Sequence, residues 1–221
     1  MQYLDQKAYA QTINSARNKP VPDLKWYHEH ELNNSLLDIQ ERGIKPSHAL
    51  PYNYLVNLED GAIKMTNLKE RAVPLIIYDR KRLEADDFYF SYALYSGQEL
   101  IHSVDAGKYD YEVFGPNGFY RLFKGESRPE IKASLIYHPS ENKVQFIINK
   151  VDKDVQEIVI DDLYEKSSRI VSLQKDENNI AFSLHKTKGW YDLRISSGNT
   201  VWHFAGRLET GKPSVSDPHW Q

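Results

Sequence analysis

From Ala49 onward the sequence consists of short runs in which hydrophobic and polar residues alternate, separated by clusters of Gly, Asn, Asp and Lys. Alternation with a period of two is typical of β-strands that bury one side and expose the other. The pattern predicts two sets of seven strands, at 52–58, 62–67, 73–79, 88–95, 98–104, 108–114 and 119–123, and at 132–138, 143–149, 155–161, 168–174, 179–185, 189–195 and 200–205. Short strands with frequent turn residues between them favour an all-β sandwich.

The two sets of strands resemble copies of one unit. When residues 107–124 are shifted by 82 positions, the identical residues are Gly107 and Gly189, Tyr109 and Tyr191, Asp110 and Asp192, and Asn117 and Asn199. Composition alone would give roughly one identity over this length. We therefore predict an internal duplication that forms two tandem Ig-like, seven-stranded β-sandwich domains, at 46–127 and 128–221, joined by a short, stiff connector near 124–130.

Residues 1–45 differ from the rest and are predicted to form a short helical and linker segment that precedes the sandwich domains. Pro22-Asp23 is a helix start signal and Gly43 a stop signal, and the apolar residues between them have near-helical spacing. This segment has few apolar residues, so we expect it to pack on something else. The resemblance described below identifies what that partner is.

The segment 113–125, VFGPNGFYRLFKG, combines three glycines with a proline and aromatic residues. A phosphate-binding loop needs GxGxxG or GxxxxGK[ST] spacing before a helix, and this segment has neither. Asn117-Gly118 lies between two alternating runs, and Asn and Gly tolerate the positive φ angles of a tight primed turn. The segment is therefore predicted to be a β-hairpin.

Composition excludes several classes of function. The chain has 40% hydrophobic and 27% charged residues and a net charge of −3, without a clustered basic face, so no nucleic-acid partner is expected. There is no transmembrane segment and no apolar signal-peptide stretch, so the protein either stays inside the cell or is part of a longer exported chain. The absence of Cys excludes disulfides and thiolate chemistry but leaves the compartment open.

Candidate catalytic and metal-binding groups do not form a recognised motif. His28 and His30 lie two residues apart, so they would point to opposite sides of a helix. The adjacent acids at Asp86-Asp87 and Asp161-Asp162 are typical of solvated turns, and they lack the spacing of a calcium loop. No GxSxG or HExxH sequence occurs. We expect no catalytic residues, no metal site and no cofactor in this chain.

Aromatic residues are the remaining candidates for binding, because sandwich domains bind sugars or partners with exposed rings. Trp190 and Trp220 carry large rings, and the residues that we single out as candidate binding residues are Asn117, Phe119 and Trp202. The alternative is that these rings fill the core, which is the commoner role of aromatic residues in strands. Phe119 is the least certain of them, because it lies beside a turn.

Two long stretches resemble a known family. They are QERGIKPSHALPYNY at 40–54, and the pair formed by GPNGFYRLFKG at 115–125 with HFAGRLETGKPSVSDP at 203–218. Together they resemble the C-terminal region of bacterial phosphocholine-preferring phospholipases C. The resemblance covers nearly the whole chain, although His48 stands where a small residue or Cys is frequent, and the second repeat is rich in Lys.

The resemblance implies a fold and a place in a larger protein. In that family a catalytic phosphoesterase domain precedes a connector and two similar β domains, so residues 1–45 would be the tail of the catalytic domain and the connector. The upstream catalytic domain of the same chain is then the expected partner. The family's nucleophile and its metal-binding residues have no counterpart here. The family's twin-arginine export signal would place the full-length parent outside the cytoplasm, secreted or periplasmic.

We therefore expect a non-catalytic C-terminal module of a secreted phospholipase C, which stabilises the catalytic domain or helps to place it at a substrate surface. A phospholipid headgroup or membrane surface is a second expected partner, although no loop combines exposed aromatic residues with a basic rim. The alternative is an independent Ig-like module that binds carbohydrate or serves in adhesion. That alternative predicts a coplanar strip of exposed aromatic rings.

Overall fold

The structure is a computed structural model, and it describes residues 43–85, 88–105, 107–126 and 129–219. The described residues belong to one compact unit that begins at Gly43. The helices predicted for 1–45 lie outside the described residues, apart from positions 43–45. The candidate residues His28, His30, Asp86, Asp87 and Trp220 also lie outside them.

The described chain is built almost entirely of β-strands. In chain order these are β1 (Pro46–Ser47), β2 (Tyr54–Glu59), β3 (Ala62–Asn67), β4 (Val73–Asp79), β5 (Tyr89–Leu94), β6 (Glu99–Ser103), β7 (Lys108–Phe114), β8 (Tyr120–Glu126), β9 (Ile131–His138), β10 (Lys143–Lys150), β11 (Glu157–Asp162), β12 (Ser167–Ser172), β13 (Glu177–Ser183), β14 (Trp190–Ser197), β15 (Thr200–Arg207) and β16 (Ser214–Val215). Two short 3₁₀ turns are η1 (Arg80–Arg82) and η2 (Pro139–Glu141). Each predicted strand has a counterpart among β2 to β15, which confirms the all-β fold class.

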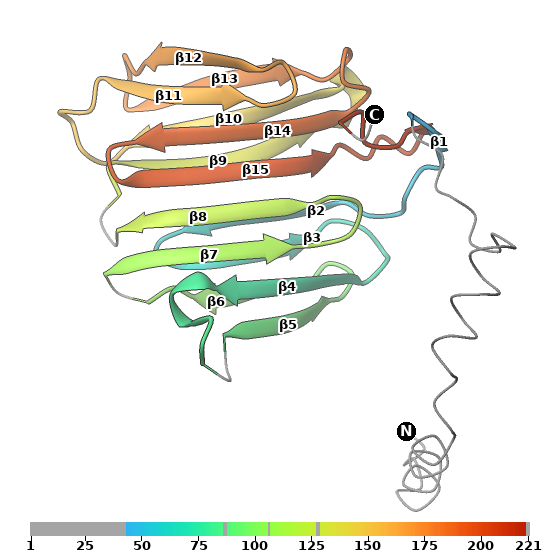
Figure 1. Ribbon diagram of the computed structural model, residues 1–221, viewed down its shortest axis with the longest axis horizontal. Coiled ribbons are helices and arrows are strands. Elements are labelled where there is room, and N and C mark those ends of the chain that lie inside the picture. Colours follow the sequence, from blue (N-terminus) through green and yellow to red (C-terminus); the bar gives the residue numbers. More distant parts are fainter. Residues whose placement is uncertain (1–42, 86–87, 106, 127–128, 220–221) are drawn as a thin grey trace, which may run out of the picture. The chain divides into compact units, whose positions relative to one another are not determined.

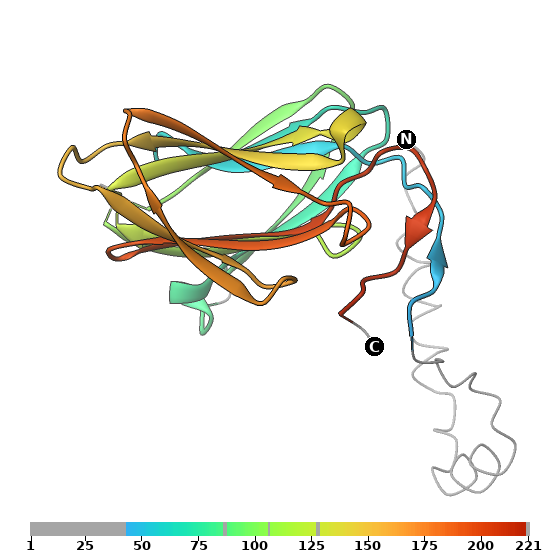
Figure 2. The same ribbon diagram turned by 90° about the horizontal axis from the view of Figure 1, so that it is seen from above.

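The strands form two layers. An eight-stranded sheet in the order β12-β11-β14-β15-β8-β7-β4-β5 makes one layer (Figure 1). Two three-stranded sheets, β2-β3-β6 and β13-β10-β9, make the other layer, which is separated from the first in the view from above (Figure 2). Each predicted repeat contributes three strands to one layer and four to the other.

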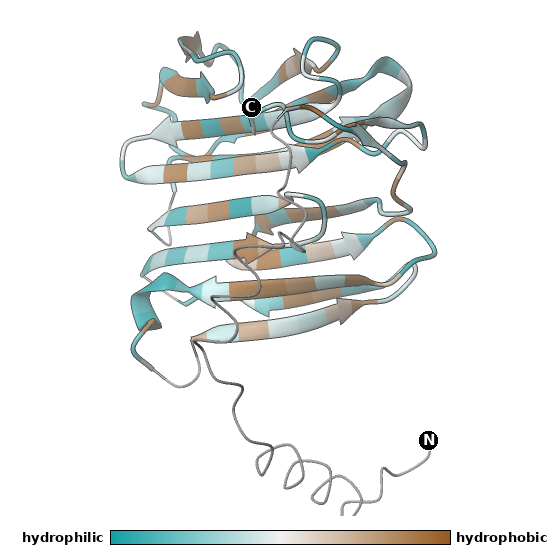
Figure 3. Cartoon of the chain, turned by 45° about the vertical axis from the view of Figure 1, so that its right-hand side comes forward, coloured by the Kyte–Doolittle hydropathy of each residue, from teal (hydrophilic) through white to brown (hydrophobic). Residues whose placement is uncertain are grey.

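Alternating side chains account for the two layers. In β7, Tyr109, Tyr111 and Val113 are buried between the sheets, whereas Asp110 and Glu112 point to the outer side, as the pattern predicted. The strands consequently show bands of hydrophobic and hydrophilic residues along their length (Figure 3). Residues from both layers and from both repeats form one continuous hydrophobic cluster.

The two repeats meet along β8 and β15, which pair antiparallel between Tyr120↔Ala205 and Lys124↔Val201. In the other layer β2 lies beside β9. Where the sequence predicted only a connector between them, the two repeats share the eight-stranded sheet and one hydrophobic core. A strand edge left open at β8 or β15 would expose unpaired backbone groups, and this pairing satisfies them. The division into two domains at 127 and 128, and their Ig-like assignment, stay predictions.

Candidate functional site

The segments that carry the two long motifs meet at one end of the sandwich. β1 pairs antiparallel with β16, joining Pro46 to Val215 and Ser47 to Ser214. We call the assembly of residues 45–54, 115–121 and 207–216 the junction. The three segments are far apart in the sequence, so their contacts join distant parts of the chain at this end of the sandwich.

Glu209 accepts hydrogen bonds from the other two segments of the junction. Its Oε2 accepts from the Leu50 N–H at 3.3 Å, and its Oε1 accepts from the Asn117 amide at 2.7 Å. Arg207 Nη1 lies 3.7 Å from Oε1, and both side chains of this ion pair are nearly buried. The same Arg207 atom donates to Ser47 Oγ at 3.1 Å. A carboxylate with this many donors is held in one position.

The β7–β8 hairpin carries Asn117 into the junction. Asn117 and Gly118 have φ angles of 59° and 69°, which confirms the predicted primed turn. The Tyr54 hydroxyl donates to the carbonyl of Pro116 at 3.3 Å. Trp190 packs over the other side of the turn, since a Cβ added to Gly118 would lie 3.1 Å from its ring atom Cζ3.

Arg121 is fully buried behind the hairpin, and its described hydrogen-bond partners are all uncharged. Nη1 donates to the carbonyls of Tyr120 and Ala205 at 2.8 and 2.9 Å. Nη2 donates to the hydroxyls of Tyr137 and Tyr191 at 2.9 and 3.0 Å. Burial raises the pKa of Tyr137 well above its usual value, so its phenol stays neutral and available as a hydrogen-bond partner.

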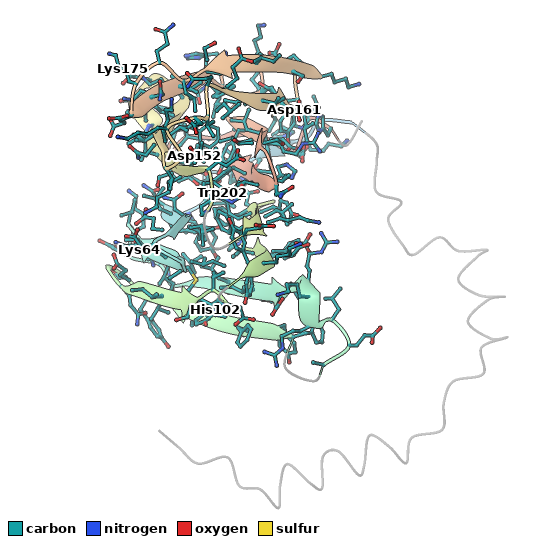
Figure 4. All side chains as sticks on the ribbon, turned by 90° about the vertical axis from the view of Figure 1, so that its left-hand side faces the viewer. Lys64, His102, Asp152, Asp161, Lys175 and Trp202 are labelled. Carbon is teal, nitrogen blue, oxygen red and sulfur yellow. The ribbon has the colours of Figure 1, made fainter. Side chains whose placement is uncertain are left out.

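Phe119 belongs to this buried cluster. Its ring lies under the guanidinium of Arg121, 4.0 Å from ring centre to Cζ, and only 6% of its surface is exposed. Trp202 is fully buried away from the junction, between the strands of the two repeats (Figure 4), and its Nε1 donates to the Tyr109 hydroxyl at 3.2 Å. Neither ring offers a face to solvent, so both take the core role that was the alternative expectation.

The space at the junction limits what it can bind. The cavity between Tyr52, Tyr54, Tyr137 and Arg207 has a volume of about 20 Å³, which is room for about one water molecule. A wider, open cleft of about 590 Å³ adjoins it and is lined by residues 49–53, 69–71 and 209–211. The arrangement can hold three segments together, and its enclosed part is too small for an organic ligand.

Other titratable groups of the described residues serve as hydrogen-bond partners. Asp161 pairs with Arg194 at 2.8 Å, and Asp162 accepts from the turn amide of Tyr164 at 3.1 Å. His203 and Asp192 form a hydrogen-bonded pair on the outer side of the large sheet. No group of three or more His, Asp or Glu side chains in the described ranges is placed to hold a metal ion.

Sequence reasoning found only part of this site. It singled out Asn117 and Phe119, which the structure places in or behind the junction, and Trp202, which it places elsewhere. It missed Glu209, Arg207 and Arg121, although the first two lie within the quoted motif 203–218. The sequence did contain a signal for Arg121. In the alternating pattern of β8 it occupies a position that faces the core, between Tyr120 and Leu122, which face outward.

Comparison with known proteins relates the chain to one family. Residues 46–126 match the family model described as "Bacterial phospholipase C, C-terminal domain". The chain is 28% identical over 204 residues to the non-hemolytic phospholipase C of Pseudomonas aeruginosa and 28% identical over 221 residues to the hemolytic phospholipase C of that organism. It is 26% identical over 200 residues to the non-hemolytic phospholipase C of Burkholderia pseudomallei.

Each of these alignments covers 81% of this chain but only 28% to 30% of the relative. The chain thus spans less than a third of the length of the relatives that it matches. These matches confirm the family resemblance read from the motifs.

Proposed function

We propose that this chain, which carries the C-terminal domain of the bacterial phospholipases C at residues 46–126, is a non-catalytic module of such an enzyme. The catalytic phosphoesterase domain would precede it in the same polypeptide and hydrolyse phosphatidylcholine-type phospholipids. The module would scaffold that domain or help to place it at its substrate surface. The intact enzyme would act outside the cytoplasm, secreted or periplasmic.

The observation that carries this proposal is that the polar residues of the family motifs contact one another. Glu209 accepts hydrogen bonds from the Asn117 amide and the Leu50 N–H and forms an ion pair with Arg207, so these polar groups join three segments of the chain. A catalytic group would need a free atom to act on a substrate, whereas both carboxylate oxygens of Glu209 accept hydrogen bonds within the junction, although an open cleft adjoins it. The motifs that resemble the family therefore support a structural role in a larger protein.

Placement at a membrane surface is a separate part of the proposal. Among the described residues, no helix has the length and apolar character needed to cross a membrane. The carbohydrate-binding alternative is not favoured, because the Phe119 and Trp202 rings on which it relied are buried.

The test compares the 221-residue chain with the intact polypeptide that contains it, using a chromogenic phosphocholine ester as substrate. We expect turnover by the intact polypeptide and none above background by the chain alone, with or without added zinc or calcium. Turnover by the chain alone would overturn the non-catalytic assignment. An intact polypeptide without phospholipase C activity would overturn the proposed parentage.

Scaffolding is tested in the intact polypeptide by loosening the module at a distance from any reacting group. Glu209→Gln should lower the temperature at which phospholipase activity is lost, because the junction that Glu209 holds would open more often. Glu99→Gln, which changes a half-exposed surface pair with Lys64, is the matched control. Equal inactivation temperatures for the two variants would argue against scaffolding.

A further inference from the structure

Aromatic side chains gather on the outer side of the eight-stranded sheet, facing away from the core. The rings form a connected row, which we call the aromatic patch, made of Tyr78 of β4, Phe88 just before β5, Tyr89 at the start of β5, Phe114 at the end of β7 and Tyr120 at the start of β8. Tyr89 and Phe114 are 51% and 40% exposed. Exposed apolar groups that form a connected surface mark interaction sites more often than single exposed residues do.

The rings of the aromatic patch contact one another at varied angles, and Tyr78 and Phe88 are stacked, with centroids 5.9 Å apart and planes inclined at 30°. Tyr78 and Phe114 have centroids 5.7 Å apart with planes inclined at 81°, and Phe114 and Tyr120 lie 5.2 Å apart at 57°. Phe88 and Tyr89 lie 5.4 Å apart at 68°. Such rings do not present the coplanar strip that was expected of a carbohydrate-binding module. They form an uneven apolar surface, which side chains of a protein partner can fill.

The second repeat shows that the fold does not need these rings. Tyr78 pairs with Tyr89 and with Glu112 across the first half of the large sheet. In the second half Asp161 pairs with Ser168 and with Arg194 in the same arrangement, and the shift of 82 places Arg194 on Glu112.

By the same register Phe114 corresponds to Ser196 of β14. Aspartate and serines therefore occupy the places of Tyr78, Tyr89 and Phe114, and they build the same strands with polar side chains. The aromatic residues are thus dispensable for forming the sheet, which points to a role in binding.

The chain enters the unit at the end of the sandwich that holds the turn between Phe114 and Tyr120 of the aromatic patch (Figure 1). Residues 43–45 lead into β1, which pairs with β16, and the Val215 carbonyl of β16 accepts a hydrogen bond from Trp190 Nε1 at 3.0 Å. Trp190 packs over Gly118, in the turn that separates Phe114 from Tyr120. Any domain attached before residue 43 is tethered at this end, which raises its effective concentration at the aromatic patch.

The polar groups beside the aromatic patch are already paired. Glu112 accepts from the Tyr120 hydroxyl at 2.8 Å and forms an ion pair with Arg80 at 3.2 Å. The patch therefore combines tyrosine and phenylalanine with a neutralised charge, the composition typical of the centre of a protein–protein interface.

We propose that the aromatic patch is the surface on which the catalytic domain of the same polypeptide docks. This inference rests on the proposed function, because it names the surface through which the module would scaffold that domain. The occupant is a protein domain held in reach by the covalent connection at residue 43.

Hydroxyl-radical footprinting of the 221-residue chain and of the intact polypeptide tests the proposal. Tyr89 and Phe114 should be labelled in the chain and lose labelling in the intact polypeptide. Tyr95, which is 64% exposed and lies in the turn after β5, serves as an internal reference and should be labelled equally in both.

Several outcomes would overturn the proposal. One is equal labelling of Tyr89 in the 221-residue chain and in the intact polypeptide. If the intact polypeptide then still hydrolyses a phosphocholine ester, docking at the patch is wrong but the proposed function is not. Protection that appears in the 221-residue chain with rising concentration, together with a dimer in size-exclusion chromatography, would assign the patch to a second copy. Protection that appears only with phosphatidylcholine vesicles would assign it to a lipid surface.

A paired substitution adds a functional readout. Tyr89→Ser with Phe114→Ser introduces the residues that the second repeat has at Ser168 and Ser196. The variant chain should keep its circular dichroism spectrum, whereas the intact variant should lose phospholipase activity at a lower temperature than the wild type. Ile170→Ser, which removes an apolar side chain that is 68% exposed in β12, is the matched control. Equal inactivation temperatures for the pair and the control would contradict docking at the aromatic patch.

Discussion

Arg121 of the first repeat donates a hydrogen bond of 3.0 Å to the hydroxyl of Tyr191 in the second. The same guanidinium contacts Tyr137 of the second repeat and the carbonyl of Ala205 across the β8–β15 pairing. A fully buried cation thus bridges the two repeats through neutral partners. The seam between the repeats is therefore held by directed hydrogen bonds as well as by hydrophobic contacts.

Replacing Arg121 separates the contribution of its volume from that of its charge. Arg121→Ala should lower the free energy of unfolding by about 3 kcal/mol or more, because it leaves a cavity and removes four hydrogen bonds. Arg121→Met keeps most of the volume and removes a buried charge, so its cost should be smaller. Urea unfolding followed by tryptophan fluorescence measures both variants. Equal losses for the two would show that the guanidinium, with its charge and hydrogen bonds, and not the side-chain volume, is responsible.

The sequence was sufficient to predict the strands, because alternation along each strand is a local property. It also predicted the turn at Asn117 and Gly118, where few residue types tolerate positive φ angles. It did not predict the pairing of β8 with β15. The last strand of each repeat has the same alternating pattern as the other strands, so the sequence does not mark it as an edge that pairs. The pairing of β8 with β15 depends on contacts between residues about 80 positions apart in the sequence.

Prediction of the site had the same limit. Asn117 was found through its turn geometry, but its partner Glu209 lies 92 residues away, and no pattern of alternation in the sequence connects the two. Phe119 and Trp202 were selected as large aromatic residues, and sequence alone does not tell which side of a strand faces the second layer at a repeat boundary. The aromatic patch was missed because its rings come from four strands whose order in the sheet was unknown.

Stability should fall on acidification because of His102. Burial lowers the pKa of its imidazole below the usual value, and the nearby charges of Asp79 and Asp105 oppose this shift only in part. The unfolded chain therefore binds a proton at a higher pH than the folded chain does. The contribution to stability is complete above the unfolded pKa of about 6.5 and is lost as the pH falls toward the folded pKa.

Urea unfolding at pH 7.5 and pH 5.5 should show this loss in the wild type and less of it in His102→Gln. The Tyr92 hydroxyl lies 2.8 Å from His102 Nδ1, and a glutamine side chain can also hydrogen-bond there without titrating. If the two proteins lost the same stability between these pH values, His102 would not be the responsible group.

Glycine at position 118 is required for two reasons that a matched pair of variants can separate. Gly118 has a φ of 69°, and an added Cβ would also lie 3.1 Å from Trp190 Cζ3. Gly97 has a similar φ of 65°, with open space around it. Gly97→Ala should cost about 1 kcal/mol through the left-handed backbone alone, and Gly118→Ala should cost more. Thermal unfolding of both variants measures the difference, and equal costs would show that Trp190 yields freely.

Removing the charge of Glu209 should open the junction without unfolding the sandwich. In Glu209→Gln the ion pair with Arg207 is lost, and an amide N–H would face the Leu50 N–H or the Asn117 amide, each of which now donates to a carboxylate oxygen. We expect a loss of about 1–3 kcal/mol and faster tryptic cleavage after Lys212. Glu99→Gln, at a half-exposed pair with Lys64, should cost no more than about 1 kcal/mol and leave that cleavage rate unchanged. The pairing of β8 with β15 does not involve Glu209, so the cleaved Glu209→Gln chain should keep its β-sheet circular dichroism spectrum. A collapse of that spectrum on cleavage would mean that the terminal segment is part of the core.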